Sequence, residues 1–252
     1  MKRVFLPILC AIVAYVVYAA TLPVASVEDA RAVSDTSART TLVIDLPTAN
    51  VYCACFGAYV DAGTARVEAA RYVDRGAAGY IRPESGRYLV LASAYGTEGD
   101  ARSVCTHISE NEGIDTSVCA FSAESVSVRV TATERQLTAL SAAVDALQKY
   151  PAEMNALALR IDAGELDSKT ARALVEVART ELGACERELR ISLADTDDRF
   201  ATGLYALLND YAEATRAASG DQNLKGLALS SVLKYNYIAS RLSVIDFMNS
   251  LQ

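Results

Sequence analysis

The sequence contains one structural unit twice. Tyr52 to Arg66 reads YCACFGAYVDAGTAR, and Tyr88 to Arg102, which begins 36 residues after Tyr52, reads YLVLASAYGTEGDAR. Each copy starts as an apolar run typical of a strand, passes through a short turn and continues into an Ala- and Arg-rich stretch typical of a helix. Two copies are too few for a solenoid, so the repeat predicts a single compact, pseudo-symmetric domain around a shared core.

The repeat extends into two β-α-β halves. Asp61 and Thr97 are the expected N-caps of the two helices, because their side-chain oxygens can accept hydrogen bonds from the free N–H groups of a first helical turn. A further alternation at 126–130 is expected to add an edge strand or to extend the fourth strand. The predicted order is strand 51–59, helix 61–75, strand 78–82, strand 87–94, helix 97–111 and strand 115–121.

From Thr133 onward the spacing of apolar residues changes from two to about 3.6, which predicts helices. Thr133 and Gln136 form a capping-box pattern at the start of the first helix, which Pro151 is expected to interrupt or kink. The short joints between the helices indicate an antiparallel all-α region. Three further helices are expected to start near Ser168, after Thr196 and after Gly220.

The N-terminal segment indicates a membrane anchor. Residues 4–24 carry no charge and follow Lys2 and Arg3, and a helix of this length can cross a hydrocarbon core of about 30 Å. The basic pair is expected to stay in the cytoplasm, with the bulk of the chain outside the cell membrane. A cleaved signal peptide is the alternative. The expected organisation is an anchor at 1–25, a tether at 26–46, a βαββαβ domain at 47–131 and a helical region at 132–252.

The motifs of several function classes are missing from the sequence. The single histidine, His107, lies in a predicted helix, and no catalytic triad, P-loop, zinc-protease or dinucleotide motif occurs. We therefore expect no enzymatic activity, no cofactor and no metal. The net charge is −7 and no segment is strongly basic, so nucleic acid is not an expected partner.

The six cysteines do not form a dense disulfide framework. Cys10 lies in the predicted anchor, and five cysteines follow it, an odd number that cannot pair completely. Cys53 and Cys55 alternate along a strand and therefore share one face. We expect them to be buried and unpaired, and the alternative is a bridge between one of them and Cys119.

The predicted binding surface is the sheet face that the two helices leave free. Alternation places every second residue of the first and third strands on this face, and a tyrosine ends the apolar run of each strand. A face of this kind can take a ligand or a protein partner. Its candidate residues are Cys53, Cys55, Gly57, Tyr59, Leu89, Leu91, Ser93 and Tyr95.

The strand and turn at 54–59, followed by a Gly/Ala helix start, and the echo at 88–95 resemble the SPOR (sporulation-related repeat) domain. That family has an aliphatic-Gln-aliphatic-Gly-Ala-Phe first strand and a Tyr-Arg-Val-x-Val-Gly-Pro-Phe third strand. The resemblance covers about residues 48–131. It implies a βαββαβ, ferredoxin-like fold and binding to peptidoglycan of the bacterial cell envelope, particularly glycan strands stripped of stem peptides, as in division or sporulation.

The chain departs from the SPOR pattern on the face expected to touch glycan. Cys55 stands where the family has Gln, Leu89 stands where it has Arg, and Ser93-Ala94 replaces Gly-Pro. Thiols and aliphatic groups offer little to a sugar, so we expect something to cover this face, and the helices after Thr133 are the nearest candidates. The rival hypothesis is a non-catalytic scaffold or protein-interaction module that has lost glycan binding and has an envelope protein as its partner.

Overall fold

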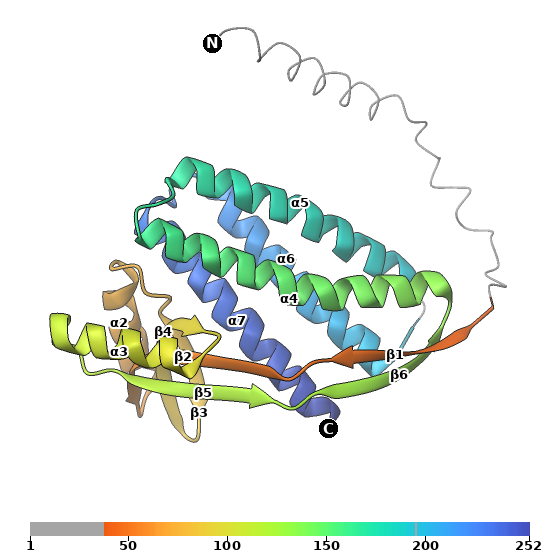
Figure 1. Ribbon diagram of the computed structural model, residues 1–252, viewed down its shortest axis with the longest axis horizontal. Helices are drawn as coiled ribbons and strands as arrows, with labels where there is room; N and C mark the ends of the chain where they lie inside the picture. The colour runs from red at the N-terminus through yellow and green to blue at the C-terminus, as the bar shows by residue number, and fades with distance from the viewer. Residues whose placement is uncertain (1–37, 195) are drawn as a thin grey trace, which may run out of the picture. The chain divides into compact units, whose positions relative to one another are not determined.

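The computed structural model describes residues 38–194 and 196–252, and this part of the chain has an α+β fold with six helices and two antiparallel sheets (Figure 1). No helix within these ranges has both the length and the apolar character needed to span a bilayer. The predicted anchor at 1–25, the tether up to residue 37 and Cys10 lie outside the described residues.

The repeated segment forms the β-α-β-β-α-β order predicted from the sequence. Asp61 caps α2 by accepting a hydrogen bond from the Thr64 N–H at 2.8 Å, and Thr97 caps α3 by accepting one from the Asp100 N–H at 3.1 Å. The four strands form one antiparallel sheet in the order β3-β4-β2-β5. The elements are β2 (Ala49–Tyr59), α2 (Ala62–Val73), β3 (Tyr80–Glu84), β4 (Arg87–Tyr95), α3 (Glu98–Glu112) and β5 (Ser117–Ala123).

A second sheet corrects two expectations. β1 (Thr40–Leu46), expected to be part of the tether, pairs antiparallel with β6 (Val126–Ala132), expected to be an edge strand or an extension of the fourth strand. Ile44 and Leu46 of β1 are buried in the core, which supplies the energy to order this segment. The two ladders are separated at Pro47, which has no N–H to donate between strands.

The helices after residue 132 confirm the sequence-based order. Thr133 and Gln136 form the predicted capping box, and the first helix continues through Pro151, which does not end it. Successive helices pack against each other, and the last one returns to the first (Figure 1). These helices are α4 (Glu134–Asp162), α5 (Ser168–Ser192), α6 (Arg199–Gly220) and α7 (Leu227–Leu251).

The predicted boundary between residues 47–131 and 132–252 does not separate two cores. One large apolar cluster includes Cys53, Cys55 and Leu91 of the sheet together with residues of all four C-terminal helices. A smaller cluster on the other face of the sheet contains Ala65 and Ala69 of α2. Because the sheet shares its main core with the helices, residues 38–252 form a single unit with its own interior.

Candidate functional site

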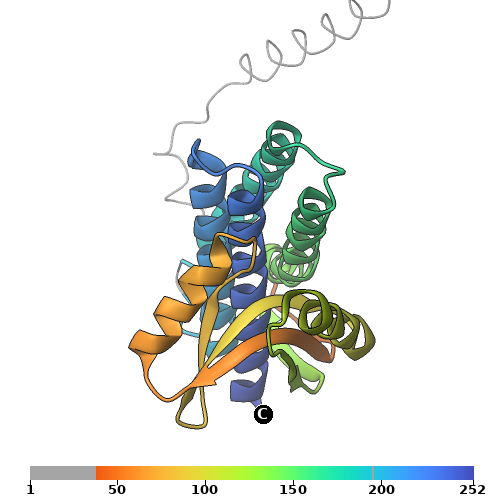
Figure 2. The same ribbon diagram turned by 90° about the vertical axis from the view of Figure 1, so that its left-hand side faces the viewer.

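Helix α7 covers the sheet face on which the sequence predicted a binding site. It packs against β2, β4 and β5, as seen where it crosses the sheet in Figure 2. Cys53 and Leu91 are 0% exposed and Cys55 is 2% exposed, and Leu89 packs against the same cluster. The expectation that helices after Thr133 cover this face is therefore confirmed, and Cys53, Cys55 and Leu91 are not accessible to a ligand.

Three of the eight predicted site residues lie on the opposite face of the sheet. The β2–β4 register shifts between Ala54 and Cys55 and again between Cys55 and Ala58, as β-bulges do. A single extra residue reverses the direction of every side chain beyond it. Tyr59 consequently joins the small cluster under α2, while Ser93 and Tyr95 face the α2 and α3 side.

Gly57 shows why the first strand can make this bulge. Its φ of +153° is accessible mainly to glycine, and a Cβ there would lie 2.7 Å from the hydroxyl oxygen of Tyr59. Gly57 is therefore a backbone requirement of the bulge. The bulge explains why position 57 is a glycine, without the ligand-binding role predicted for this residue.

An open cleft of about 500 Å³ lies on the side of the sheet that carries α2 and α3, and we call it the helix-side cleft. It runs between α2, α3 and the start of α7, and its floor is the end of β4. The lining combines aromatic rings with polar and charged groups, a mixture typical of ligand sites. The residues that carry its chemistry are Phe56, Tyr72, Arg75, Ser93, Tyr95, His107, Glu112, Asp162 and Lys234.

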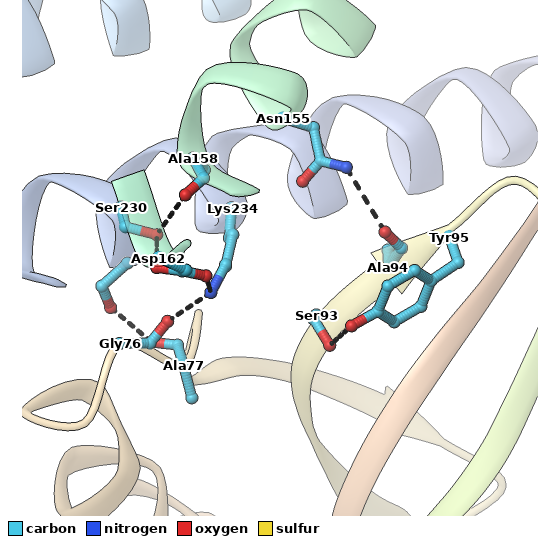
Figure 3. Close-up of polar contacts among 11 residues, drawn as sticks. Gly76, Ala77, Ser93, Ala94, Tyr95, Asn155, Ala158, Asp162, Ser230 and Lys234 are labelled. Atoms are coloured by element: carbon cyan, nitrogen blue, oxygen red, sulfur yellow. Dashed lines mark hydrogen bonds and ion pairs between the residues drawn. The ribbon is translucent and has the colours of Figure 1, made fainter. Parts of the chain in front are cut away.

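A buried charge network forms one wall of the helix-side cleft (Figure 3). Lys234 of α7, 7% exposed, forms an ion pair with Asp162 at the end of α4 and donates a hydrogen bond to the Gly76 carbonyl oxygen at 2.8 Å. The second carboxylate oxygen of Asp162 accepts a hydrogen bond from the Ser230 hydroxyl at 2.6 Å. Each buried polar group thus has partners, which is the condition under which a buried charge is tolerated.

The aromatic part of the helix-side cleft is held in place by contacts of its own. The Ser93 hydroxyl donates to the Tyr95 oxygen at 3.0 Å, as drawn in Figure 3, and burial is the main cause that raises the pKa of Tyr95. Phe56 meets Tyr72 edge to face with ring centroids 4.6 Å apart. Rings packed in this way present fixed surfaces for stacking.

The polar part of the cleft joins α2 to α3. Arg75, after the end of α2, forms an ion pair with Glu112 at the end of α3. His107 of α3 lies within hydrogen-bonding distance of the Asn111 side-chain nitrogen, at 3.0 Å from its Nδ1. The Arg75–Glu112 ion pair and the His107 ring lie at the exposed rim of the cleft, where they can reach a ligand.

The five cysteines of the described residues are all free, and Cys53 and Cys55 are buried, which confirms the expectation that these two are buried and unpaired. Cys53 faces Cys119 across the β2–β5 ladder, and burial raises the pKa of Cys53 to about 12. A hydrogen bond between Cys55 and Cys119 lowers the pKa of Cys55 and raises that of Cys119. Within residues 38–194 and 196–252, no group of three or more His, Cys, Asp or Glu side chains is arranged to hold a metal ion.

No protein-family model, curated protein or solved structure matches the chain. The residues of the helix-side cleft are consequently assigned from geometry alone.

The sequence interpretation did not identify Lys234 and Asp162 as site residues. A signal was present, because in the helix expected after Gly220 Lys234 lies three residues after Ser231 and four before Ile238, which places the three residues on one stripe of the helix. A lysine on such a stripe must either leave the core or find a buried acceptor. Its partners come from 72 and 158 residues away in the chain, so no local pattern could name them.

Proposed function

We propose that this chain is a non-catalytic interaction module that binds a protein partner through the helix-side cleft. In this proposal, its βαββαβ unit is SPOR-like and ferredoxin-like, and the chain's own helix α7 occupies the sheet face. The single observation that supports this proposal is the complete burial of Cys53 and Leu91 beneath α7. A glycan that bound this face would have to displace the helix.

Displacing α7 is energetically prohibitive. Four of its aliphatic side chains are at most 1% exposed, and each contributes about 1.5–3 kcal/mol through burial. Their sum is of the order of the whole stability of a domain, about 5–15 kcal/mol. The surface beneath would offer thiols and aliphatic groups to the hydroxyls of a sugar. The four residues are Leu229, Leu233, Ile238 and Leu242.

A second candidate function keeps peptidoglycan as the ligand and moves its site to the helix-side cleft. The observation that favours it is the combination of Tyr72 and Tyr95 with the polar Ser93 and His107, because sugars bind to aromatic faces flanked by hydrogen-bonding groups. Tyr72 lines the cleft and, among the described residues, its ring pairs with that of Phe56, so we use its loss to separate the two candidates.

The proposed location of the module is the outer side of a bacterial cell membrane. The support comes from the uncharged segment 4–24 after Lys2 and Arg3, which would anchor the chain with its N-terminus in the cytoplasm. Protease added to intact spheroplasts should then digest residues 38–252. Complete protection of this unit, with a periplasmic control protein digested, would contradict the location.

Co-sedimentation with peptidoglycan distinguishes the two candidate functions. Residues 38–252 are mixed with intact peptidoglycan and with peptidoglycan from which an amidase has removed the stem peptides. We expect no pelleting above background with either. Pelleting of the wild type that Tyr72→Ala abolishes would support glycan binding in the helix-side cleft and would overturn the protein-partner proposal.

A positive test of the protein partner uses a photo-reactive phenylalanine analogue placed at Tyr72 in cells. We expect one discrete protein adduct on illumination. The matched control carries the same analogue at Leu174, which is 41% exposed on α5, away from the cleft lining. Adducts of the same pattern from both positions, or from neither, would contradict a partner site in the cleft.

A further inference from the structure

A second pocket, separate from the helix-side cleft, lies between α4, α6, α7 and the turn before β2. Its volume is about 190 Å³, and most of its lining is aliphatic or aromatic. Its lining shares no residue with the helix-side cleft. The apolar walls are formed chiefly by Val144, Leu147, Leu204, Val244, Phe247 and Met248.

One wall of this pocket is built by an unusually close approach of α6 and α7. Gly203 of α6 faces Phe247 of α7 so closely that a Cβ on the glycine would lie 2.3 Å from the ring. Phe247 also stacks on Phe200 with ring centroids 6.1 Å apart. The Phe247 ring is thus packed against two residues of α6, which gives the pocket a defined wall.

Arg241 is the one cationic residue among the described residues that line this pocket. It is half-buried, and it makes no hydrogen bond or ion pair with any residue in 38–194 or 196–252. Asp246, the acid that follows it on α7, is already bound by both terminal nitrogens of Arg82, at 2.9 and 2.8 Å. The other polar side chains of the lining, Thr48 and Gln148, carry no charge.

We propose that this pocket binds a small amphipathic monocarboxylate, an arylalkyl or short-chain alkyl acid, with its apolar group between α4, α6 and α7 and its carboxylate on Arg241. The guanidinium can give a carboxylate two parallel, charge-assisted hydrogen bonds, which are stronger than hydrogen bonds between neutral groups. A cavity of roughly 150 Å³ holds a benzene-sized molecule, so a pocket of about 190 Å³ suits a phenyl ring or a short alkyl chain.

The same features argue against other ligand classes. A phosphate or nucleotide carries more charge than one arginine can neutralise, and most of the walls would offer it nothing. A cationic ligand would be repelled by Arg241. A neutral hydrocarbon would leave the guanidinium of Arg241 without a partner. A long acyl chain would exceed the volume of the pocket.

The test compares 4-phenylbutyrate with 4-phenylbutanol, which has the same ring and chain without the charge. Residues 38–252 form one compact unit with its own core, so this part of the chain is used. Binding is followed by the methyl NMR signals of Val144, Leu204 and Val244. The acid is expected to bind saturably at this pocket, about tenfold or more tightly than the alcohol, as one charge-assisted hydrogen-bonded contact predicts.

Two variants complete the test. Arg241→Gln should weaken phenylbutyrate binding about tenfold or more and leave phenylbutanol binding within about twofold. Arg187→Gln removes an exposed arginine of α5 outside the pocket lining, and it should change the affinity for neither phenylbutyrate nor phenylbutanol. The proposal is overturned if the wild type shows no saturable shift at millimolar acid, if acid and alcohol bind equally, or if both variants weaken the acid alike. Methyl spectra without ligand verify that each variant is folded.

Discussion

The Nζ of Lys234, in the first third of α7, donates a hydrogen bond to the carbonyl oxygen of Gly76, 2.8 Å away and 158 residues earlier in the chain. Gly76 belongs to the turn that follows α2, so this contact ties the last helix to the repeated βαββαβ unit. The neighbouring hydroxyl of Ser231 donates to the next carbonyl, that of Ala77. Helix α7 is therefore positioned on the sheet by polar contacts at its edge as well as by apolar burial.

Removing the charge of Lys234 should destabilise the protein strongly. In Lys234→Met the carboxylate of Asp162, whose side chain is 29% exposed, loses its ion-pair partner. An uncompensated buried charge costs about 3–5 kcal/mol, and the partial exposure of Asp162 places the expected loss near the lower value. Urea unfolding followed by circular dichroism measures the change.

The control for this substitution is the double variant Asp162→Asn/Lys234→Met, which removes both charges. It should recover much of the lost stability, because no unpaired charge remains. A loss below about 1 kcal/mol in Lys234→Met, or a double variant less stable than the sum of its single changes, would contradict a buried and compensated pair.

Leu91→Ala tests whether the sheet face is closed. Leu91 is 0% exposed beneath α7, so its truncation should cost about 2–5 kcal/mol of unfolding free energy. Leu42→Ala is the matched control, because Leu42 is also a strand leucine but is 44% exposed, and its change should stay within about 0.5 kcal/mol. Similar, small effects of both substitutions in urea unfolding would mean that the face is open to solvent.

The free cysteines predict a definite thiol count. Residues 38–252 should release five equivalents of chromophore from Ellman's reagent in denaturant without reductant, because all five cysteines are free. In the native protein, Cys53 should react slowest, since it is fully buried and its pKa is raised to about 12. Fewer than five thiols in denaturant would show that a disulfide forms.

Asp167, the N-cap of α5, should make part of the stability dependent on acid pH. Hydrogen bonds from the Thr170 hydroxyl and backbone N–H lower the pKa of Asp167 in the folded state. Between the folded and unfolded pKa values the unfolded chain binds more protons, so this contribution is present above about pH 4 and is lost as pH falls through the folded pKa.

Asp167→Asn keeps an N-cap that does not titrate. The wild type should be the more stable of the two at neutral pH, and the difference in unfolding free energy should shrink as the pH is lowered from about 6 to about 3. Asp210→Asn, an exposed change in α6, shows how much the altered net charge contributes. A difference between wild type and Asp167→Asn that is constant over this pH range would refute the titration.

Much of the element order could be predicted from the sequence because its signals are local. The repeat around Tyr52 and Tyr88 predicted two β-α-β halves, and Asp61, Thr97 and Thr133 marked three helix starts that the structure confirms. Each of these signals acts within one turn of helix or one strand. Such local signals form the same helix or strand in any fold whose tertiary packing does not oppose them.

The candidate site depended on features that no local pattern carries. Two bulges in the β2–β4 pair moved Tyr59, Ser93 and Tyr95 to the other face, because one inserted residue reverses a strand's alternation. β1 was missed because residues 40–46 become a strand only when Val126–Ala132 lies beside them. Pairing partners 80 or more residues apart cannot be read from either segment alone.

The sequence by itself determined the order of the helices and of the strands of the repeated unit, and that Cys55 and Leu89 place a thiol and an aliphatic group where the SPOR pattern has polar side chains. The tertiary structure decided that α7 covers the sheet, that Lys234 meets Asp162 and Gly76, and that Arg241, at the edge of an apolar pocket, has no acidic partner among residues 38–194 and 196–252. The physical reason is the distance along the sequence between the groups that interact. Hydrogen bonds of a cap or a turn join neighbours in the chain, whereas burial and charge pairing depend on which distant surfaces the whole fold brings together.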